Sequence, residues 1–226
     1  MDKPISSPLA EVRGKEIIPL HPERLASLLE STHSVSIDVG CGDGRLVYRS
    51  AKDNPGMLCI GIDPAVEGMR EVSWRAGRKP ARGGVRNALF LRGTVDTLPG
   101  MLAGKANHVS IHFPWNRLLE VLILPDEGAL RRLAALGGDG ADFYIRLNAS
   151  VLEDGAYCAR LGIPATDMER LTSVLAGEWA NAGLRLVHVE RVEGEVGPRS
   201  TWGRRLTVGA GRSTFIIKGE FLSSCS

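Results

Sequence analysis

The sequence predicts an α/β fold in which helices cover both faces of a mostly parallel sheet. Three observations predict it. Short apolar runs typical of buried strands alternate with helix-like stretches between residues 34 and 113, and repeated βα units of this length imply parallel strands with right-handed crossovers. A glycine-rich turn follows the first apolar run. The chain has 226 residues, 43% of them apolar, which suits one domain with a single core.

The glycine-rich turn joins an apolar run at 35–39 to the start of a helix. Gly40, Gly42 and Gly44 alternate with other residues, so the backbone can adopt positive φ and a ligand can lie against its N–H groups. The spacing departs from the dinucleotide fingerprint G-x-G-x-x-G, and Asp38 stands in front of it. A carboxylate there repels a pyrophosphate but attracts an ammonium group. S-adenosylmethionine carries such a group and no phosphate, so the turn predicts a site for it; a strand-to-helix turn without a ligand is the alternative.

The remaining elements follow from the same alternation of patterns. Residues 1–32 are expected to form an N-terminal extension, a short hairpin and a helix, before a Rossmann-like core at 33–226 within one domain. Strands are expected at 34–39, 57–62, 88–93, 107–113, 141–148, 184–192 and 213–221. Helices are expected at 43–52, 65–78, 97–103, 126–136 and 166–182. The loops expected to bind the target are 75–87, 114–125 and 194–212, since functional residues favour long irregular segments.

Further candidates for cofactor binding follow the later strands. Asp63 ends the second strand, where a carboxylate can accept bidentate hydrogen bonds from two ribose hydroxyls; its alternative role is to cap the next helix. After the third strand, Val95 is expected to face the adenine ring and Asp96 its amino group, although Asp96 could equally cap a helix. Phe113 and Pro114 end the fourth strand. Ligands of open α/β sheets collect at these carboxyl ends.

Composition narrows the classes of partner. The net charge of +2 is too small to indicate nucleic-acid binding by itself. The four cysteines have no C-x-x-C spacing and no histidine at metal-ligand spacing, so neither a disulfide framework nor a metal site is expected. No apolar run approaches the roughly 20 residues that span a bilayer, and the first residues lack the order of a signal peptide. A cytoplasmic protein without membrane contact is expected.

Positive charge and tryptophan nevertheless gather locally. Arg75, Arg78, Lys79, Arg82 and Arg86 occur in a stretch without acidic residues, and such runs release counterions when they contact phosphates. A second basic run lies near Trp202 and consists of Arg199, Arg204, Arg205, Arg212 and Lys218. Trp115 follows the fourth strand, and together with Trp202 it could clamp one flipped base. The alternatives are a solvated charged face and half-buried packing indoles; Trp74 and Trp179, inside expected helices, are assigned to packing.

These motifs together resemble a known family. The cofactor motifs alone resemble those of class I methyltransferases, which implies a seven-stranded sheet whose last two strands pair antiparallel. The full set resembles the aminoglycoside-resistance 16S ribosomal RNA (adenine(1408)-N(1))-methyltransferases of the kanamycin–apramycin type. The motifs that carry the resemblance are IDVGCGDGR at 37–45, GIDP at 61–64, RKPARGG at 78–84, HFPW-x-x-LL at 112–119 and S-x-W-x-x-RL at 200–206.

The resemblance implies an enzyme that acts on the assembled 30S subunit and methylates N1 of adenosine 1408 in helix 44. It implies S-adenosylmethionine as methyl donor and S-adenosylhomocysteine as product. A monomer without a metal is expected, since an enzyme that docks on a ribosome needs no partner subunit. Trp115 and Trp202 would hold the flipped adenine, while Ser200 and the two basic groups would contact the RNA. The chain departs from the family at Asn116 and Arg117, where a glycine and a small hydroxyl residue are usual. Bulkier side chains there put the level of activity in question.

Three alternatives stay open. A tRNA guanine-N7 methyltransferase also has phenylalanine-proline and a nearby tryptophan after the fourth strand. A methyltransferase-fold protein that binds ribosomal RNA without catalysis would need neither the acids nor the glycines of the cofactor motifs. A small-molecule methyltransferase would leave the basic runs without a role.

Overall fold

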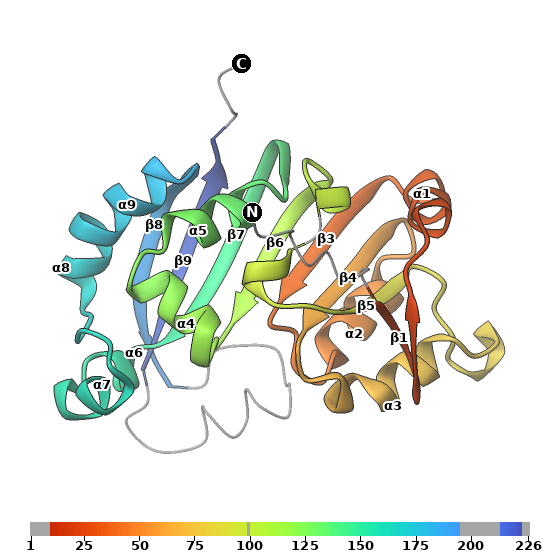
Figure 1. Ribbon diagram of the computed structural model, residues 1–226, viewed down its shortest axis with the longest axis horizontal. Helices are drawn as coiled ribbons and strands as arrows, with labels where there is room; N and C mark the ends of the chain where they lie inside the picture. The colour runs from red at the N-terminus through yellow and green to blue at the C-terminus, as the bar shows by residue number, and fades with distance from the viewer. Residues whose placement is uncertain (1–9, 99, 195–212, 223–226) are drawn as a thin grey trace, which may run out of the picture.

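The computed structural model describes residues 10–98, 100–194 and 213–222, and they build one nine-stranded sheet with helices on both faces (Figure 1). The strand order is β2-β1-β5-β4-β3-β6-β7-β9-β8. The strands are β1 Ala10–Arg13, β2 Glu16–Pro19, β3 Ser34–Val39, β4 Met57–Asp63, β5 Ala88–Arg92, β6 Ala106–His112, β7 Gly137–Asn148, β8 Leu184–Glu193 and β9 Ser213–Phe221. Strands β5, β4, β3, β6 and β7 are parallel, whereas β9 runs antiparallel to both β7 and β8.

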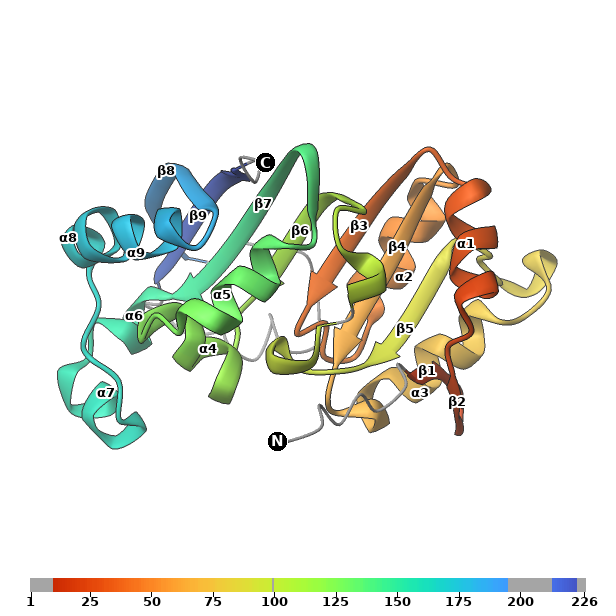
Figure 2. The ribbon, with the colours of Figure 1, turned by 45° about the horizontal axis from the view of Figure 1, so that its top comes forward.

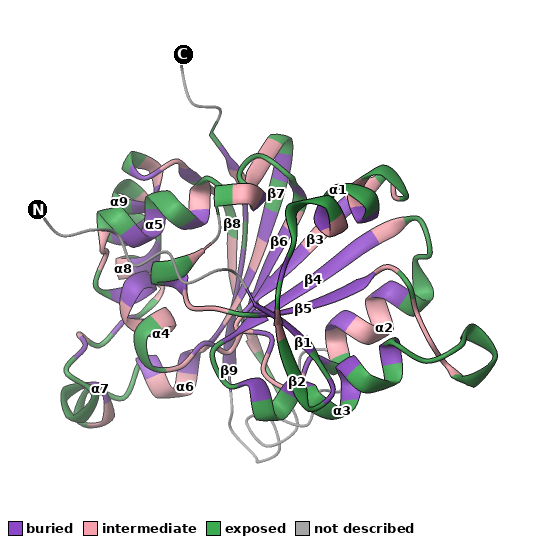
Figure 3. Cartoon of the chain, turned by 45° about the vertical axis from the view of Figure 1, so that its right-hand side comes forward, coloured by how far each residue is buried: buried purple, intermediate pink, exposed green. Residues whose placement is uncertain are grey.

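Two separate sets of side chains cover the faces of the sheet. On one face, helices α1, α4, α5 and α9 pack on a core that includes Ile37, Ile60 and Phe215. On the other face, α2 and α3 pack on a smaller cluster around Met69 and Phe90. Figure 2 shows these helices on either side of the strands, and Figure 3 shows buried residues along β3, β4 and β5.

The helices have the following bounds. They are α1 Pro22–Glu30, α2 Arg45–Asp53, α3 Val66–Ala76, α4 Asn116–Ile123, α5 Glu127–Ala134, α6 Ala149–Leu152, α7 Gly155–Leu161, α8 Met168–Arg170 and α9 Ala176–Asn181. Short 3-10 turns are η1 Pro80–Arg82, η2 Val95–Thr97 and η3 Gly100–Leu102, and a π-helical turn, η4 Leu171–Leu175, joins α8 to α9. Within the described ranges, no helix has both the length and the apolarity required to traverse a bilayer.

The predicted fold class and the antiparallel pairing of the last two strands are confirmed, and three details are wrong. The sheet has nine strands instead of seven, because the N-terminal hairpin joins it through β1 and β5. This pairing covers the end of β5 at Leu91 and Arg92, which would otherwise lie on an exposed edge. The helix predicted at 97–103 is replaced by η2 and η3, since proline and glycine in that stretch oppose an α-helix.

The third error concerns the loop predicted at 114–125, which contains α4. Leu119, Val121, Leu122 and Ile123 are buried there, so the segment gains more from packing than an exposed target-binding loop would. The short helices α6 and α7 were also not predicted. The part of the loop at 194–212 that follows residue 194 lies outside the described residues.

Candidate active site

A cavity of about 640 Å³ opens at the carboxyl ends of β3, β4 and β6. Parallel strands bring their carboxyl ends to the same edge, so segments distant in sequence meet there. Most of the residues predicted to bind the cofactor line it. They are Asp38, Gly40, Gly42, Asp63, Val95, Phe113 and Pro114, and Trp115 lines it as well. Gly44 is not among the lining residues; it is the N-cap of α2, with φ of 67°.

The glycine loop adopts the backbone that its sequence predicts. Gly40 and Gly42 have φ values of 77° and 58°, a region that costs other residues about 1–2 kcal/mol. A Cβ atom on Gly40 would lie 2.8 Å from Cδ2 of Leu118 in α4. Glycine at this position therefore keeps both the turn and the floor of the cavity open.

Asp38 is buried beneath this loop, with a relative exposure of 6%. Its Oδ1 accepts a hydrogen bond of 2.8 Å from the Ser110 hydroxyl. Burial raises the pKa of Asp38 to about 7, against the lowering effect of that hydrogen bond. Because burial disfavours the ionised form of this carboxyl, a cation placed next to it would stabilise that form.

Asp63 is held by two backbone donors at the end of β4. Its Oδ2 accepts from the Gly42 N–H at 2.8 Å and its Oδ1 from the Ala65 N–H at 2.7 Å. Burial raises its pKa, whereas both N–H groups act to lower it. Each oxygen keeps a second lone pair for a further donor, so the geometry suits a pair of hydroxyls.

Val95 and Asp96 point in different directions from η2. Val95 is buried and lines the cavity, as does the preceding Thr94. Asp96 is absent from the lining residues and lies exposed between two arginines, Arg117 and Arg132. The structure therefore does not bring Asp96 into the cavity with the other candidates.

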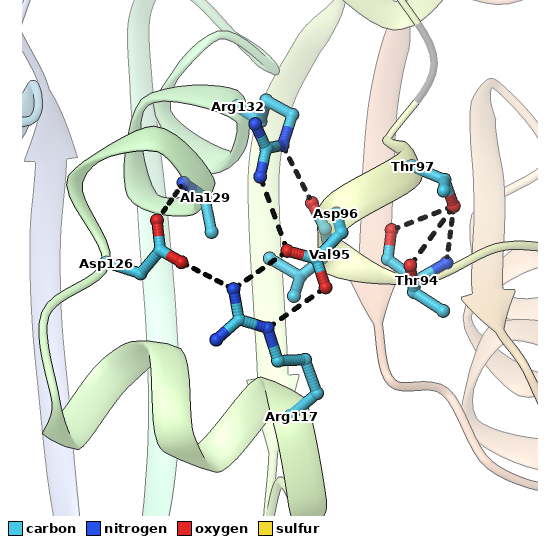
Figure 4. A network of polar contacts seen from close by, with 8 residues as sticks. All are labelled: Thr94, Val95, Asp96, Thr97, Arg117, Asp126, Ala129 and Arg132. Atoms are coloured by element: carbon cyan, nitrogen blue, oxygen red, sulfur yellow. Dashed lines mark hydrogen bonds and ion pairs between the residues drawn. The ribbon is translucent and has the colours of Figure 1, made fainter. Parts of the chain in front are cut away.

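Arg117 ties three elements together at the cavity mouth (Figure 4). From the first turn of α4, it donates to both carboxylate oxygens of Asp96, each at 3.0 Å, and to Oδ2 of Asp126. Asp126 is also the N-cap of α5, where it accepts from the Ala129 N–H. The hydrogen bonds from Arg117 hold the pKa of Asp96 below its usual range. Arg117, unusual at this position for the family that the sequence resembles, thus has a structural role.

Trp115 lies shortly after β6, between two residues whose backbone φ is positive. Among the described residues, Phe113 and Asn116 are the only non-glycine residues with positive φ, at 51° and 48°. Asparagine tolerates this region better than most residues. The Trp115 ring is half-buried, lines the cavity, and keeps its Nε1 buried without a hydrogen-bond partner within the described ranges. Trp115 therefore forms part of the cavity wall, with a polar edge atom that no described residue engages.

The first basic run lies on the surface at the end of α3 and beyond. Its five cationic side chains, Arg75, Arg78, Lys79, Arg82 and Arg86, are all exposed. Arg75 pairs with Glu71, and the Arg78 guanidinium lies 4.9 Å from the centre of the Trp74 ring.

The assignment of tryptophans to packing is correct for Trp179, which is fully buried, and wrong for Trp74, which is 59% exposed. A helical position alone does not say which face of the helix meets the core. The remaining candidates, Ser200, Trp202, Arg204, Arg205 and Arg212, lie outside the described residues.

Two polar residues that line the cavity, His112 and Arg146, were not among the predicted site residues. Arg146 belongs to the half of β7 in which Tyr144 and Arg146 alternate with buried Phe143 and Ile145. A charged residue near the carboxyl end of a central strand was the signal that could have identified it.

The residues at this edge fit S-adenosylmethionine. A buried acid for an ammonium group, a carboxylate with free lone pairs for ribose, and an apolar wall at Val95 occur in one cavity. A glycine loop in which a Cβ on Gly40 would meet Leu118, another lining residue, completes the fit. This fold and site define a class I S-adenosylmethionine-dependent methyltransferase.

Comparison with known proteins identifies the family. The NpmA family model, described as 16S rRNA (adenine(1408)-N(1))-methyltransferase, matches residues 10–221. A protein of that name from Escherichia coli is 31% identical over 92% of this chain and 97% of its own length. The chain therefore belongs to the 16S rRNA (adenine(1408)-N(1))-methyltransferase family, as the motifs suggested.

Solved structures agree with this assignment. A variant of the enzyme of that name from Catenulisporales acidiphilia, with its cosubstrate SAM, has a TM-score of 0.87 at 29% identity, covering 96% of this chain and 99% of its own. The antibiotic-resistance methyltransferase Kmr has a TM-score of 0.77 at 40% identity, covering 94% of this chain and all of its own.

Proposed function

We propose that this protein transfers a methyl group from S-adenosylmethionine to N1 of adenosine 1408 in helix 44 of 16S rRNA, within the 30S subunit, and thereby gives kanamycin and apramycin resistance. One observation carries the proposal. In a chain of this family, buried Asp38, Asp63 and the half-buried ring of Trp115 line one cavity at the carboxyl edge of the sheet.

The cofactor supplies an electrophilic methyl group on a sulfonium centre. Asp38 binds the ammonium of its methionine group, Asp63 its ribose hydroxyls, and Val95 contacts its adenine. The two carboxylates would thus hold the donor on either side of its sulfonium centre, in the cavity that Trp115 also lines.

The acceptor needs orientation more than activation. Adenine N1 carries a lone pair at neutral pH, so no strong general base is required. Trp115 and, from the segment outside the described residues, Trp202 hold the flipped ring between two indoles. Catalysis is then chiefly proximity and orientation, and the electron-rich indole faces favour the positive charge that develops on the ring.

Recognition of the target rests on shape and charge. Arg75, Arg78, Lys79, Arg82 and Arg86 on one side, with Ser200, Arg204, Arg205 and Arg212 on the other, contact the sugar–phosphate backbone of the ribosomal RNA. Such contacts position the enzyme without reading base sequence. The same proposal places the protein in the cytoplasm, where the subunit is found, and requires no partner subunit.

Expression in an aminoglycoside-susceptible bacterium, followed by primer extension across helix 44, tests the function. We expect a reverse-transcription stop at adenosine 1408, together with resistance. Trp115→Ala or Trp202→Ala should remove the stop but change S-adenosylmethionine affinity less than threefold, and Trp115→Phe should retain part of the activity because a phenyl ring still stacks. A stop on tRNA, or none on 16S rRNA, would contradict the proposal.

A further inference from the structure

Arg146 lines the cavity and forms no ion pair with any residue in the described ranges, although its charge acts on Asp38 at longer range. Its Nε donates to the Tyr144 hydroxyl at 3.1 Å, and its guanidinium lies 4.8 Å from the centre of that ring. Its Nη1 is buried and finds no hydrogen-bond partner in the described part of the chain, and the ion pairs found there do not include Arg146. A buried charged donor without an acceptor is unfavourable. A ligand that supplied an acceptor to this atom would remove that cost.

Arg146 shares one face of the sheet with Asp38. Asp38 is paired with Ser110, Ser110 with Tyr144, and Arg146 lies two residues beyond Tyr144 on β7. Side chains at these positions point to the same side. Strands β3 and β7 are separated by β6 alone, hence by about 10 Å, so an acid and a guanidinium face one volume without pairing with each other.

His112 adds a second unused donor beside Arg146. It is the register partner of Arg146 on β6 and lines the same cavity. Burial, followed by the charge of Arg146, lowers the pKa of His112 to about 3, so the ring stays neutral. Its Nδ1 is buried and unpartnered among the described residues, and in the tautomer with the proton on Nδ1 it can donate to the same acceptor.

The geometry points to Arg146 as the residue that binds the α-carboxylate of the cofactor's methionine group, with His112 Nδ1 as a second donor. This inference rests on the proposed function, in which Asp38 binds the α-ammonium. An α-amino acid carries a cation and an anion on one carbon, and the cavity offers an acid and a guanidinium in matching positions. Arginine suits a carboxylate because its N–H groups form a planar fork. A phosphate of the RNA target fits less well, because Asp38 would repel it.

Calorimetric titration of the full-length protein with S-adenosylmethionine and with its decarboxylated analogue isolates this contact. The two ligands share the ammonium, ribose and adenine, and only the first has the carboxylate. We expect Arg146→Gln to weaken S-adenosylmethionine binding by tenfold to a hundredfold and to leave the affinity for the decarboxylated analogue unchanged. Retained analogue binding also shows that the variant is folded.

Two further variants sharpen the test. Lys218→Gln removes a charge from the neighbouring strand β9 and from the same face, outside the residues that line the cavity, so both affinities should equal those of the wild type. Arg146→Lys keeps the positive charge but loses the planar pair of N–H donors. Its affinity for S-adenosylmethionine should therefore lie between those of the wild type and Arg146→Gln.

The outcomes separate this inference from the proposed function. Equal S-adenosylmethionine affinity in the wild type and in Arg146→Gln would overturn the role of Arg146 and leave the methyltransferase assignment intact. Equal losses for both ligands would show a role in shaping the cavity and would also overturn it. Failure of the wild type to bind S-adenosylmethionine would contradict the proposed function itself.

Discussion

Asp38 makes cofactor binding depend on pH. Because burial raises its pKa to about 7, the carboxyl is mostly protonated below that pH and cannot attract an ammonium group. Binding must then release a proton, so the affinity for S-adenosylmethionine should fall by nearly tenfold per pH unit between about pH 6.5 and 5.5. Titration calorimetry at several pH values, in buffers of different ionisation enthalpy, measures both the affinity and the proton release.

Asp38→Asn is the matched control, because it removes the ionisable group and keeps the shape. Its affinity should be weak and nearly constant over the same range, and an equally steep profile in this variant would assign the pH dependence to another group. The raised pKa also has a consequence for the cofactor-free protein. The carboxyl folds more favourably when protonated, so its contribution to stability is present below about pH 4 and is lost as the pH rises toward 7.

Gly40 allows backbone strain and cavity obstruction to be separated. Gly40 and Gly104 both have positive φ, at 77° and 67°, but a Cβ atom on Gly104 would have no neighbour within 4 Å. Alanine at either position should cost about 1–2 kcal/mol of stability, hence a fall in Tm of about 2–8 °C for a chain of this size. Only Gly40→Ala, which would meet Leu118, should also weaken S-adenosylmethionine binding. Equal cofactor affinity in the two variants would refute a role of Gly40 in the cavity.

At the scale of elements, Arg117 holds the start of α4 against η2 and α5. The backbone needs such a tie, because Phe113 and Asn116 adopt unfavourable φ values on either side of Trp115. We expect Arg117→Ala to weaken S-adenosylmethionine binding several-fold and to lower the methylation rate, as the cavity wall formed by α4 becomes mobile. Because the tie is exposed, wild-type affinity should also decrease with added salt, and this decrease should be smaller in the variant.

Arg131→Ala is the control for this effect. Arg131 forms an exposed ion pair with Glu127 within α5 and does not reach α4 or η2, so its removal should leave cofactor affinity unchanged. Equal losses in both variants would show that Arg117 acts only through general surface charge.

Helices and strands were predictable from the sequence where the local apolar pattern and the packing in the fold favour the same structure. The apolar runs of β3 and β4 and the glycine turn specify a strand, a tight loop and a helix, and the structure has them within a few residues of the prediction. Predictions failed where tertiary contacts decide. Residues of α4 form a helix because their leucines are buried against the sheet, and β1 is a sheet strand because β5 offers it an edge.

At the scale of the whole molecule, the site is a product of topology. Asp38, Asp63 and Val95 were predictable as lining residues because each lies at or shortly after the carboxyl end of a strand, and the carboxyl ends of parallel strands converge. Arg146 was not, because its importance depends on its Nη1 being buried without a hydrogen-bond partner among the described residues, which only the folded arrangement shows. Asp96 shows the reverse: its sequence position suits adenine, but the arginines that the fold brings near it, Arg117 and Arg132, engage its carboxylate.

Docking on the ribosome should depend on the first basic run as a unit. Arg78, Lys79, Arg82 and Arg86 are exposed near one another after α3, and each phosphate contact adds about 0.7–0.9 to the slope of log affinity against log salt concentration. Replacing all four with glutamine should therefore reduce the slope for 30S binding by about 3 and weaken binding at low salt. S-adenosylmethionine affinity should not change, because none of the four lines the cavity.

A control variant with the same loss of charge distinguishes a docking surface from a general electrostatic attraction. Lys105, Arg131, Arg160 and Arg185 are exposed cations in other parts of the fold, and their replacement by glutamine lowers the net charge equally. Long-range attraction depends on the total charge and would weaken in both variants. Counterion release depends on contacts with phosphates and should change only in the variant of the first basic run. Filter binding to 30S subunits over a range of potassium concentrations separates the two, and equal slopes for both variants would refute docking through the first basic run.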